Sequence, residues 1–535
     1  MTKNYRRDID SLRAVSVLFV ILFHFKLPYF EGGYLGVDIF FVISGFLITK
    51  IILKDIHNES FKIKIFYLRR VRRIIPLVLF VTFSSTIFAY YFFFPSELKE
   101  YLESLLSVNL FISNFWYDSK GGYFGAALDN NPLIHFWSLS VEEQFYLFYP
   151  IIIFFFYKKK MINNFSIFII ITTLFSFSLS QFGGNLKFRY PFFESQFDFF
   201  SMPKFAFYST VTRAWEILIG CTAAIYQSDL NKKFTQKKLI INLSFLLLIF
   251  SFFLFNEATP HPSLFTFFPI LFTVLILVFN ENNISNNKIL NSKFLSYIGL
   301  ISFSLYLWHQ PILSFAKLYN IIELDFYSKF FIFLLLFPVS FISWKYIEKP
   351  FRNRKIINNN QLAGSLFIFI SFFLVIIYFT NSKIKSFDDD LVKILEHGNN
   401  YEKKYFDNCT TIPKNYIKAE NACVIGKKNK IIKHAIIGDS HAAALADAFD
   451  HKFRENGISA YLFTINGCPL TPNLYNYFDK RFKCKKYYKE LIEYLEKNKQ
   501  INKIILHSRW GFYTTGKRFN NYEGGVEIGK DSLYL

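Results

Sequence analysis

The sequence predicts a polytopic all-α membrane domain followed by an exported, incomplete α/β domain. Of the 535 residues, 52% are hydrophobic and 21% are aromatic, which is not the composition of a single soluble domain. Eleven apolar runs of about 17–22 residues, the length needed to cross a bilayer, lie before Thr380. After Thr380 the chain becomes rich in Lys, Asp, Asn and Tyr, and short apolar segments alternate in the manner of an α/β fold.

The eleven apolar runs are predicted to be transmembrane helices. The first is not a cleaved signal peptide, because it keeps charged and His residues and lacks a small-x-small site. Segment 98–117 is also apolar, but a span there would break the alternation of basic loops, so we expect an interfacial or re-entrant helix. The predicted spans are 11–28, 34–53, 74–94, 139–157, 162–182, 208–226, 239–256, 264–280, 297–318, 328–347 and 363–380.

The basic residues predict the orientation. The net charge is +21, but the Lys and Arg residues form short clusters between apolar runs, which indicates membrane topology and not nucleic-acid binding. By the positive-inside rule, the N-terminus is cytoplasmic and the C-terminal domain lies on the opposite side of the membrane. The predicted parts are a membrane domain (1–358), a linking transmembrane helix (359–384) and an extracytoplasmic domain (385–535).

The exported segment is predicted to form a strand, a turn and a helix around Ser440. Ile431–Ile437 is a β-branched run, Ala442–Phe449 favours a helix, and Ile501–His507 predicts a further strand. Four cysteines lie in this segment, which in an exported domain suggests disulfides with three possible pairings. We predict the local pairs Cys409–Cys423 and Cys468–Cys484.

His24 is the most informative residue of the first span. An ionisable side chain inside an apolar span is costly and indicates a functional site. Arg13 lies eleven residues earlier, and eleven steps of about 100° leave the two side chains within about 20° of one helix face, about 16 Å apart along the axis. The alternative is a structural His with Arg13 extending to lipid headgroups.

Seven motifs in residues 5–355 together resemble the acyltransferase-3 family of membrane O-acyltransferases. They are Tyr5–Phe25, Gly33–Thr49, Phe66–Pro76, Trp137–Pro150, Arg213–Glu216, Ser302–Pro311 and Glu348–Phe351. The segment Gly438–His441, GDSH, resembles the first block of the SGNH hydrolase fold, which implies that Ser440 is a nucleophile. The Asp-x-x-His that supplies the base in that fold is absent, and only 95 residues follow Ser440, so the domain is expected to be partial.

Acyl transfer to a hydroxyl needs donor binding and a general base. Arg70 and Arg73 share a helix face and with Arg13 could bind the phosphates of acetyl-CoA, whereas Arg69 and Arg72 fit membrane anchoring equally well. His24 is the expected base or covalent relay, and Glu143 could orient it or the acceptor. Asp38 could buffer an arginine of the donor site. Arg213 and Glu216 are expected to form an internal ion pair, and His309 is interpreted as structural.

The resemblance implies transfer of acetyl from cytoplasmic acetyl-CoA to hydroxyls of a cell-envelope glycan, with no metal. The membrane lipid and an envelope polysaccharide are the expected partners, with no nucleic acid. The opening motif and fused SGNH segment favour lipopolysaccharide O-antigen as acceptor. Peptidoglycan or another exopolysaccharide is the alternative. A transporter of glycan or acyl groups without transfer chemistry is the competing class, although the chain has no internal repeat of the kind common in transporters.

Overall fold

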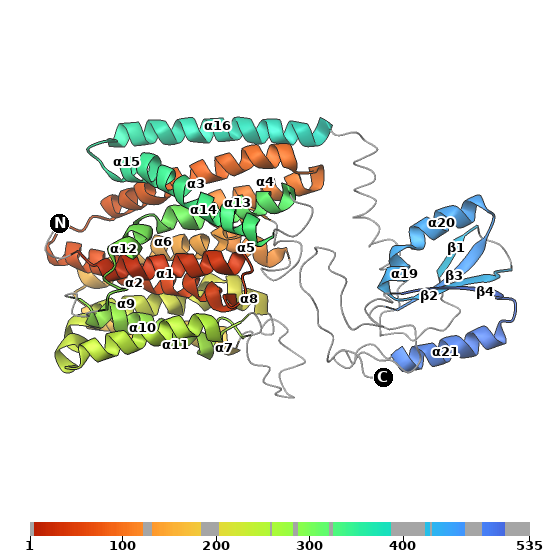
Figure 1. The fold of residues 1–535 in the computed structure, drawn as a ribbon, viewed down its shortest axis with the longest axis horizontal. Coiled ribbons are helices and arrows are strands. Elements are labelled where there is room, and N and C mark those ends of the chain that lie inside the picture. The colour runs from red at the N-terminus through yellow and green to blue at the C-terminus, as the bar shows by residue number, and fades with distance from the viewer. Residues whose placement is uncertain are drawn as a thin grey trace. The chain divides into compact units, whose positions relative to one another are not determined.

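The computed structural model describes residues 5–120, 131–182, 203–256, 259–281, 287–319, 325–386, 423–427, 431–465 and 484–508. The chain divides into two compact units, Met1–Lys385 and Ser386–Leu535 (Figure 1). The first unit is helical in its described part, and the second contains a small mixed sheet.

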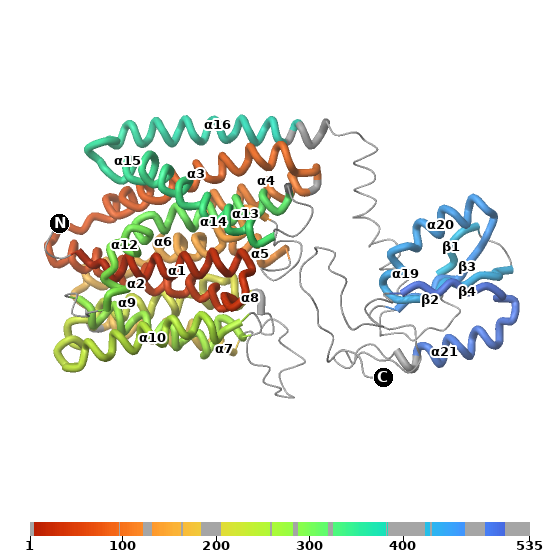
Figure 2. Tube along the Cα trace, viewed as in Figure 1, coloured from red at the N-terminus to blue at the C-terminus, as the bar shows by residue number. Residues whose placement is uncertain are grey.

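The first unit is a stack of long helices that run side by side, with α16 along one edge (Figure 2). Each of the eleven predicted spans coincides with a helix or with a pair of consecutive helices. The elements are α1 (Arg7–His24), η1 (Glu31–Tyr34), α2 (Leu35–His57), α3 (Ile63–Phe92), α4 (Pro95–Asn109), α5 (Ser113–Ser119), α6 (Phe136–Lys158), α7 (Ile162–Phe182), α8 (Pro203–Tyr208), α9 (Thr210–Lys233), α10 (Lys237–Leu254), α11 (Leu264–Phe279), α12 (Lys293–Leu300), α13 (Ser302–Tyr319), α14 (Phe326–Ser343), the π-helical η3 (Trp344–Glu348), α15 (Lys349–Arg352) and α16 (Asn359–Ser386).

Seven helices within the described residues are long and apolar enough to cross a membrane. They correspond to α2, α3, α6, α7, α10, α14 and α16. Of the four other predicted spans, α1 contains the charged residues Arg7, Asp8, Asp10 and Arg13, and α11 is only 16 residues long. The chain is therefore a membrane protein, and the count of eleven spans stays a prediction.

Three segments differ in detail from the predicted boundaries. Helix α3 begins eleven residues earlier than predicted, so Arg69–Arg73 lie inside the helix and not before it. Segment 98–117 forms two short helices, α4 and α5, which are separated where Phe111 adopts a positive φ of 55°. The ninth predicted span is divided at Ile301 into α12 and α13.

Two glycines allow α2 and α9 to pack backbone against backbone. A Cβ at Gly45 would lie 1.9 Å from the carbonyl oxygen of Ile217, and a Cβ at Gly220 would lie 2.1 Å from that of Val42. Any side chain at either position would push the helices apart. This contact fixes the distance between the two helices that carry Asp38 and Arg213.

The second unit contains a four-stranded sheet in the order β1-β3-β2-β4. Strands β2 (His434–Gly438) and β4 (Lys503–His507) are parallel, with Gly438 opposite His507, and both were predicted. Helices α19 (Ser440–Ala444) and α20 (Ala446–Glu455) together replace the single predicted helix. Sequence reasoning missed β1 (Cys423–Gly426), which is antiparallel to β3 (Ser459–Thr464), and α21 (Cys484–Lys497).

The cysteines agree in part with the predicted pattern. Cys423 is disulfide-bonded, and Cys221 is a buried free thiol in α9. The predicted partners Cys409 and Cys468 lie outside the described residues, as do Arg509 and Trp510, so the predicted pairing stays a prediction.

Candidate active site

A cavity of about 120 Å³ opens between α1, α2, α3, α6 and α13. This is far more than the ~10–15 Å³ that one water molecule requires. Its wall combines three arginines and a carboxylate with a mainly apolar surface. The lining residues are Arg13, Val37, Phe40, Phe41, Ile43, Ser44, Leu47, Ile51, Arg70, Arg73, Ile74, Ser138, Leu139, Glu142, Tyr146, Ser302, Phe303 and Tyr306.

The structure brings the predicted arginines together at this cavity. Arg13 comes from α1 and makes a long ion pair with Asp10 at 3.4 Å, while Arg70 and Arg73 come from α3. The Arg70 guanidinium lies over the ring of Tyr146, 4.3 Å from its centre, an arrangement that leaves the in-plane N–H groups available. Among the described residues, neither Arg70 nor Arg73 donates a hydrogen bond, so both retain donors for a ligand.

The other two arginines of the cluster have structural partners. Arg69 forms an ion pair with Asp55 at 3.0 Å on the surface. The buried Arg72 donates to the carbonyl oxygens of Phe351 and Ile357 at 3.0 and 2.7 Å and to the Asn359 side chain at 2.8 Å. These bonds tie α3 to the start of α16. The division of the cluster into two cavity-lining and two anchoring arginines thus follows the i, i+3 spacing.

Glu142, and not the predicted Glu143, is the carboxylate on the cavity wall. Its Oε1 accepts hydrogen bonds from Ser44 and Tyr146. Neighbouring residues on a helix point about 100° apart, so only one of the two glutamates can face the cavity. Glu143 makes no hydrogen bond to His24, and its Oε1 has no partner among the described residues. The structure therefore does not show Glu143 orienting His24, and its orientation of the acceptor stays a prediction.

Sequence reasoning missed three cavity residues of α6 whose spacing could have indicated them. Ser138, Glu142 and Tyr146 lie four residues apart on α6 and all line the cavity. Polar groups at i, i+4 and i+8 share one face of a helix, and a polar stripe in an otherwise apolar span indicates that it faces protein or a cavity.

His24 lies beyond one wall of the cavity and does not line it. Tyr306 lines the cavity, and its ring centroid is 5.4 Å from those of both His135 and His309. The His309 ring is in turn 4.9 Å from His24. The Tyr306 hydroxyl donates to the carbonyl oxygen of His135 at 3.0 Å and lies 2.5 Å from the Ser138 hydroxyl. Tyr306 therefore separates the arginine cavity from a cluster of three histidines.

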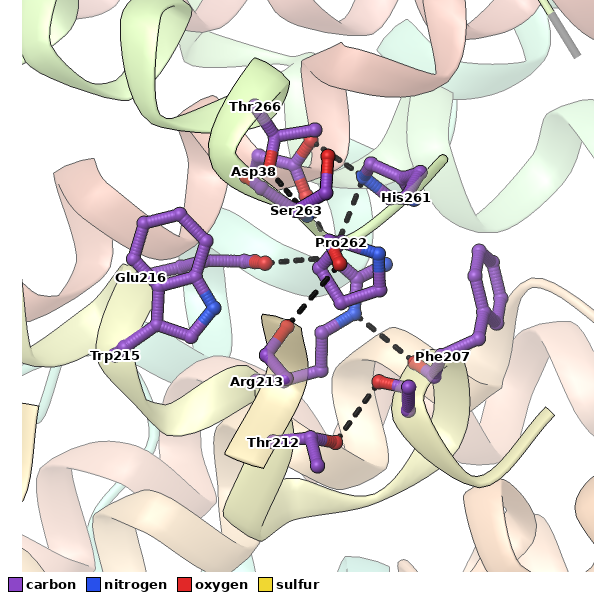
Figure 3. A network of polar contacts seen from close by, with 12 residues as sticks. Asp38, Phe207, Thr212, Arg213, Trp215, Glu216, His261, Pro262, Ser263 and Thr266 are labelled. Atoms are coloured by element: carbon purple, nitrogen blue, oxygen red, sulfur yellow. Dashed lines mark hydrogen bonds and ion pairs between the residues drawn. The ribbon is translucent and has the colours of Figure 1, made fainter. Parts of the chain in front are cut away.

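Asp38 belongs to a different, fully buried network that joins α2, α9 and the segment before α11 (Figure 3). Arg213 Nη1 lies 2.9 Å from Asp38 Oδ1 and 2.6 Å from Glu216 Oε1, which confirms the predicted Arg213–Glu216 ion pair. His261 Nε2 lies 2.9 Å from Asp38 Oδ2 and 3.3 Å from Arg213 Nη1. Burial, and then the charge of Arg213, lower the pKa of His261 well below its ordinary value, so its imidazole is neutral. Asp38 was expected to pair with an arginine, and it pairs with Arg213. It does not line the donor cavity, where it had been placed from the sequence.

In the second unit, Ser440 occupies the predicted turn at the start of α19. The Asp439 side chain accepts hydrogen bonds from the backbone N–H of His441 and from the Ser508 hydroxyl, both at 2.8 Å. A Cβ at Gly438 would lie 1.9 Å from the carbonyl oxygen of His507, so the turn requires glycine. Within the described part of this unit, no histidine or carboxylate is hydrogen-bonded to the Ser440 side chain.

Comparison with known proteins identifies the class. Residues 6–380 match the family described as an acyltransferase domain, and residues 408–532 match the SGNH domain that is fused to such domains. The chain therefore belongs to this family of membrane acyltransferases with a fused SGNH domain. The SGNH match extends to residue 532 even though the Asp-x-x-His is missing.

Individual relatives bear the name O-acetyltransferase. The O-acetyltransferase OatA of Staphylococcus aureus (strain NCTC 8325 / PS 47) is 31% identical over 65% of this chain and 58% of its own length. The relative named "Putative O-acetyltransferase SAS0844" from S. aureus (strain MSSA476) is 28% identical over 83% of this chain and 75% of its own length. The chain thus spans less than two thirds of the OatA sequence that it matches. No solved structure matches the chain.

Proposed function

We propose that this protein is an O-acetyltransferase that carries acetyl from cytoplasmic acetyl-CoA to hydroxyls of a cell-envelope glycan. The observation that carries the proposal is the cavity in which Arg13, Arg70 and Arg73 converge on an apolar throat. Arginine suits phosphate because its planar fork binds two oxygens at once. The apolar wall suits a pantetheine arm, which carries no charge.

The reaction would proceed outward along α1. The arginines hold the nucleotide phosphates, the arm extends past Tyr306, and His24 takes the proton of the acceptor hydroxyl or the acyl group itself. The distance from Arg13 to His24, about 16 Å along the helix, is within the reach of the pantetheine arm. The N-terminus is then cytoplasmic and the SGNH unit extracytoplasmic, in an inner membrane.

The acceptor is the finer part of the proposal. The opening motif favours lipopolysaccharide O-antigen, with peptidoglycan or another exopolysaccharide as the second candidate. Ser440 would receive the acyl group from the membrane unit and pass it on. Because the described residues give its hydroxyl no base, the SGNH unit alone should be a slow esterase.

Envelope glycans compared by NMR with and without this protein provide the test. We expect O-acetyl signals on one glycan class that disappear when the protein is absent, and incorporation of label when membranes receive acetyl-CoA labelled in the acetyl group. Unchanged acetylation in every glycan fraction would contradict the proposal, and label transport without ester formation would favour the transporter class.

A further inference from the structure

A cluster of three histidines, His24, His135 and His309, lies beside the cavity. The proposed function gives a role to His24 and none to the other two. His24 ends α1, His135 precedes α6, and His309 lies within α13. The ring centroids are 4.9 Å apart for His24 and His309 and 5.0 Å apart for His135 and His309. His135 and His309 are 1% and 0% exposed and His24 is partly buried, so the His309 ring lies between the other two rings.

The hydrogen bonds define the protonation of His309. Its Nδ1 lies 2.6 Å from the carbonyl oxygen of Tyr306, which can only accept, so Nδ1 carries the proton. The Nε2 atom of the neutral ring is therefore a bare acceptor, and it has no hydrogen-bond partner among the described residues. Both ring nitrogens of His135 also lack partners in that part of the chain.

Such unpaired buried groups are costly and need an explanation. A buried donor or acceptor without a partner keeps the cost of its desolvation and destabilises the folded protein. The neighbouring side chains supply no replacement: Tyr306 donates its hydroxyl to the His135 backbone, and Trp308 donates to Ser343 at 2.8 Å. Nor do the described residues form a group that could hold a metal ion. The lone pair of His309 Nε2 is kept available beside His24.

We propose that His309 is a positioning residue for His24, one that shares the proton His24 takes from the acceptor hydroxyl. The inference rests on the proposed function. In the transfer step the acceptor O–H bond breaks and its proton goes to His24 Nε2. A carbon–oxygen bond forms at the acyl carbon as the carbon–sulfur bond of the thioester breaks, and the proton returns to the departing thiolate.

The position of His24 inside a predicted span explains why sharing is useful. A full positive charge on one imidazole in such surroundings is costly. A hydrogen bond from protonated His24 to the bare Nε2 of His309 spreads that charge over two rings. The His135 ring packs against His309 and keeps that side of His309 buried.

The test measures steady-state acetyl transfer by full-length protein in membranes, with labelled acetyl-CoA and the envelope glycan as substrates. His309→Ala should lower kcat about 100-fold, at the lower end of general-base effects, with KM for acetyl-CoA changed less than twofold. His309→Gln restores an acceptor oxygen, so its kcat should be about tenfold higher than that of His309→Ala. Trp308→Phe, one residue away on α13, is the matched control and should keep kcat within twofold.

Retained binding of coenzyme A identifies variants that have folded. The inference is overturned if His309→Ala keeps the parent kcat, if kcat and donor affinity fall together, or if His309→Gln is no better than His309→Ala. If the parent protein transfers acetyl and any of these results is found, only the role of His309 is overturned. If the parent protein transfers no acetyl, the proposed function is overturned as well.

Discussion

His24 Nδ1 lies 2.8 Å from the carbonyl oxygen of Val20, one turn earlier on α1. Because a carbonyl oxygen can only accept, the Nδ1 atom of His24 carries the proton and the neutral ring presents its lone pair at Nε2. The helix backbone itself therefore selects the tautomer that a general base or an acyl-accepting nucleophile needs.

His24→Ala should abolish glycan O-acetylation. Loss of a general base costs about 10²–10⁴-fold in rate, and loss of a covalent relay costs more. The measurement is O-acetyl content of the envelope glycan at equal membrane abundance. His57→Ala, which removes an exposed histidine at the end of α2, is the matched control and should keep the parent level. Parent-level acetylation by His24→Ala would remove His24 from the mechanism.

Arg70→Lys and Arg73→Lys should each weaken coenzyme A binding about tenfold, because lysine keeps the charge but loses the planar fork. The measurement is equilibrium binding of coenzyme A to purified protein. Arg69→Lys changes the same residue type in the same cluster, but its partner is the surface carboxylate of Asp55, so binding should be unchanged. Equal affinity in all three variants would show that the cavity arginines do not recognise phosphate.

Asp38→Asn and Arg213→Ala should destabilise the fold and leave donor affinity unchanged. Removal of one partner from a buried ion pair costs about 3–5 kcal/mol, and Arg213 also donates to the carbonyl oxygen of Phe207. Thermal unfolding in detergent measures the loss, and coenzyme A binding by the folded fraction measures the affinity. A specific loss of affinity in Asp38→Asn would restore the assignment of Asp38 to the donor site.

The membrane topology can be tested with single cysteines that replace two exposed lysines. Lys452→Cys in α20 should react with a membrane-impermeant thiol reagent in spheroplasts, because the SGNH unit is proposed to be exported. Lys159→Cys, at the C-terminal end of α6, should react only after lysis. The reverse pattern would invert the proposed orientation.

Much of the fold could be predicted because membrane spans impose a strong pattern on sequence. Apolar runs of about 20 residues located the helices, and basic clusters marked their ends. Boundaries were less visible: Arg69–Arg73 continue α3 because a helix tolerates charged residues where they reach a cavity, a surface or a neighbouring segment. Strands β1 and β3 were missed because apolar runs of only four to six residues do not by themselves distinguish a strand from a loop, although Asn456-Gly457 before β3 is a turn signal.

The site was predictable where helix geometry and the family motif decide and not where tertiary packing does. The i, i+3 spacing divided the cluster into the pairs Arg70–Arg73 and Arg69–Arg72, and the resemblance to the family motif favoured the first pair for donor binding. The choice between Glu142 and Glu143 depends on the rotation of α6, which neighbouring helices set. Likewise His309, interpreted from sequence as structural, lies against His24 only because α1 and α13 pack together.

The central claim is that acetyl enters through the arginine cavity from the cytoplasm and leaves beyond His24. Sealed inner-membrane vesicles of known orientation test it most directly, with labelled acetyl-CoA supplied on one face only. We predict labelled glycan on the opposite face when acetyl-CoA meets the cytoplasmic face, and none from Arg70→Ala or His24→Ala vesicles. Equal labelling from either face, or labelling that survives both substitutions, would contradict the account.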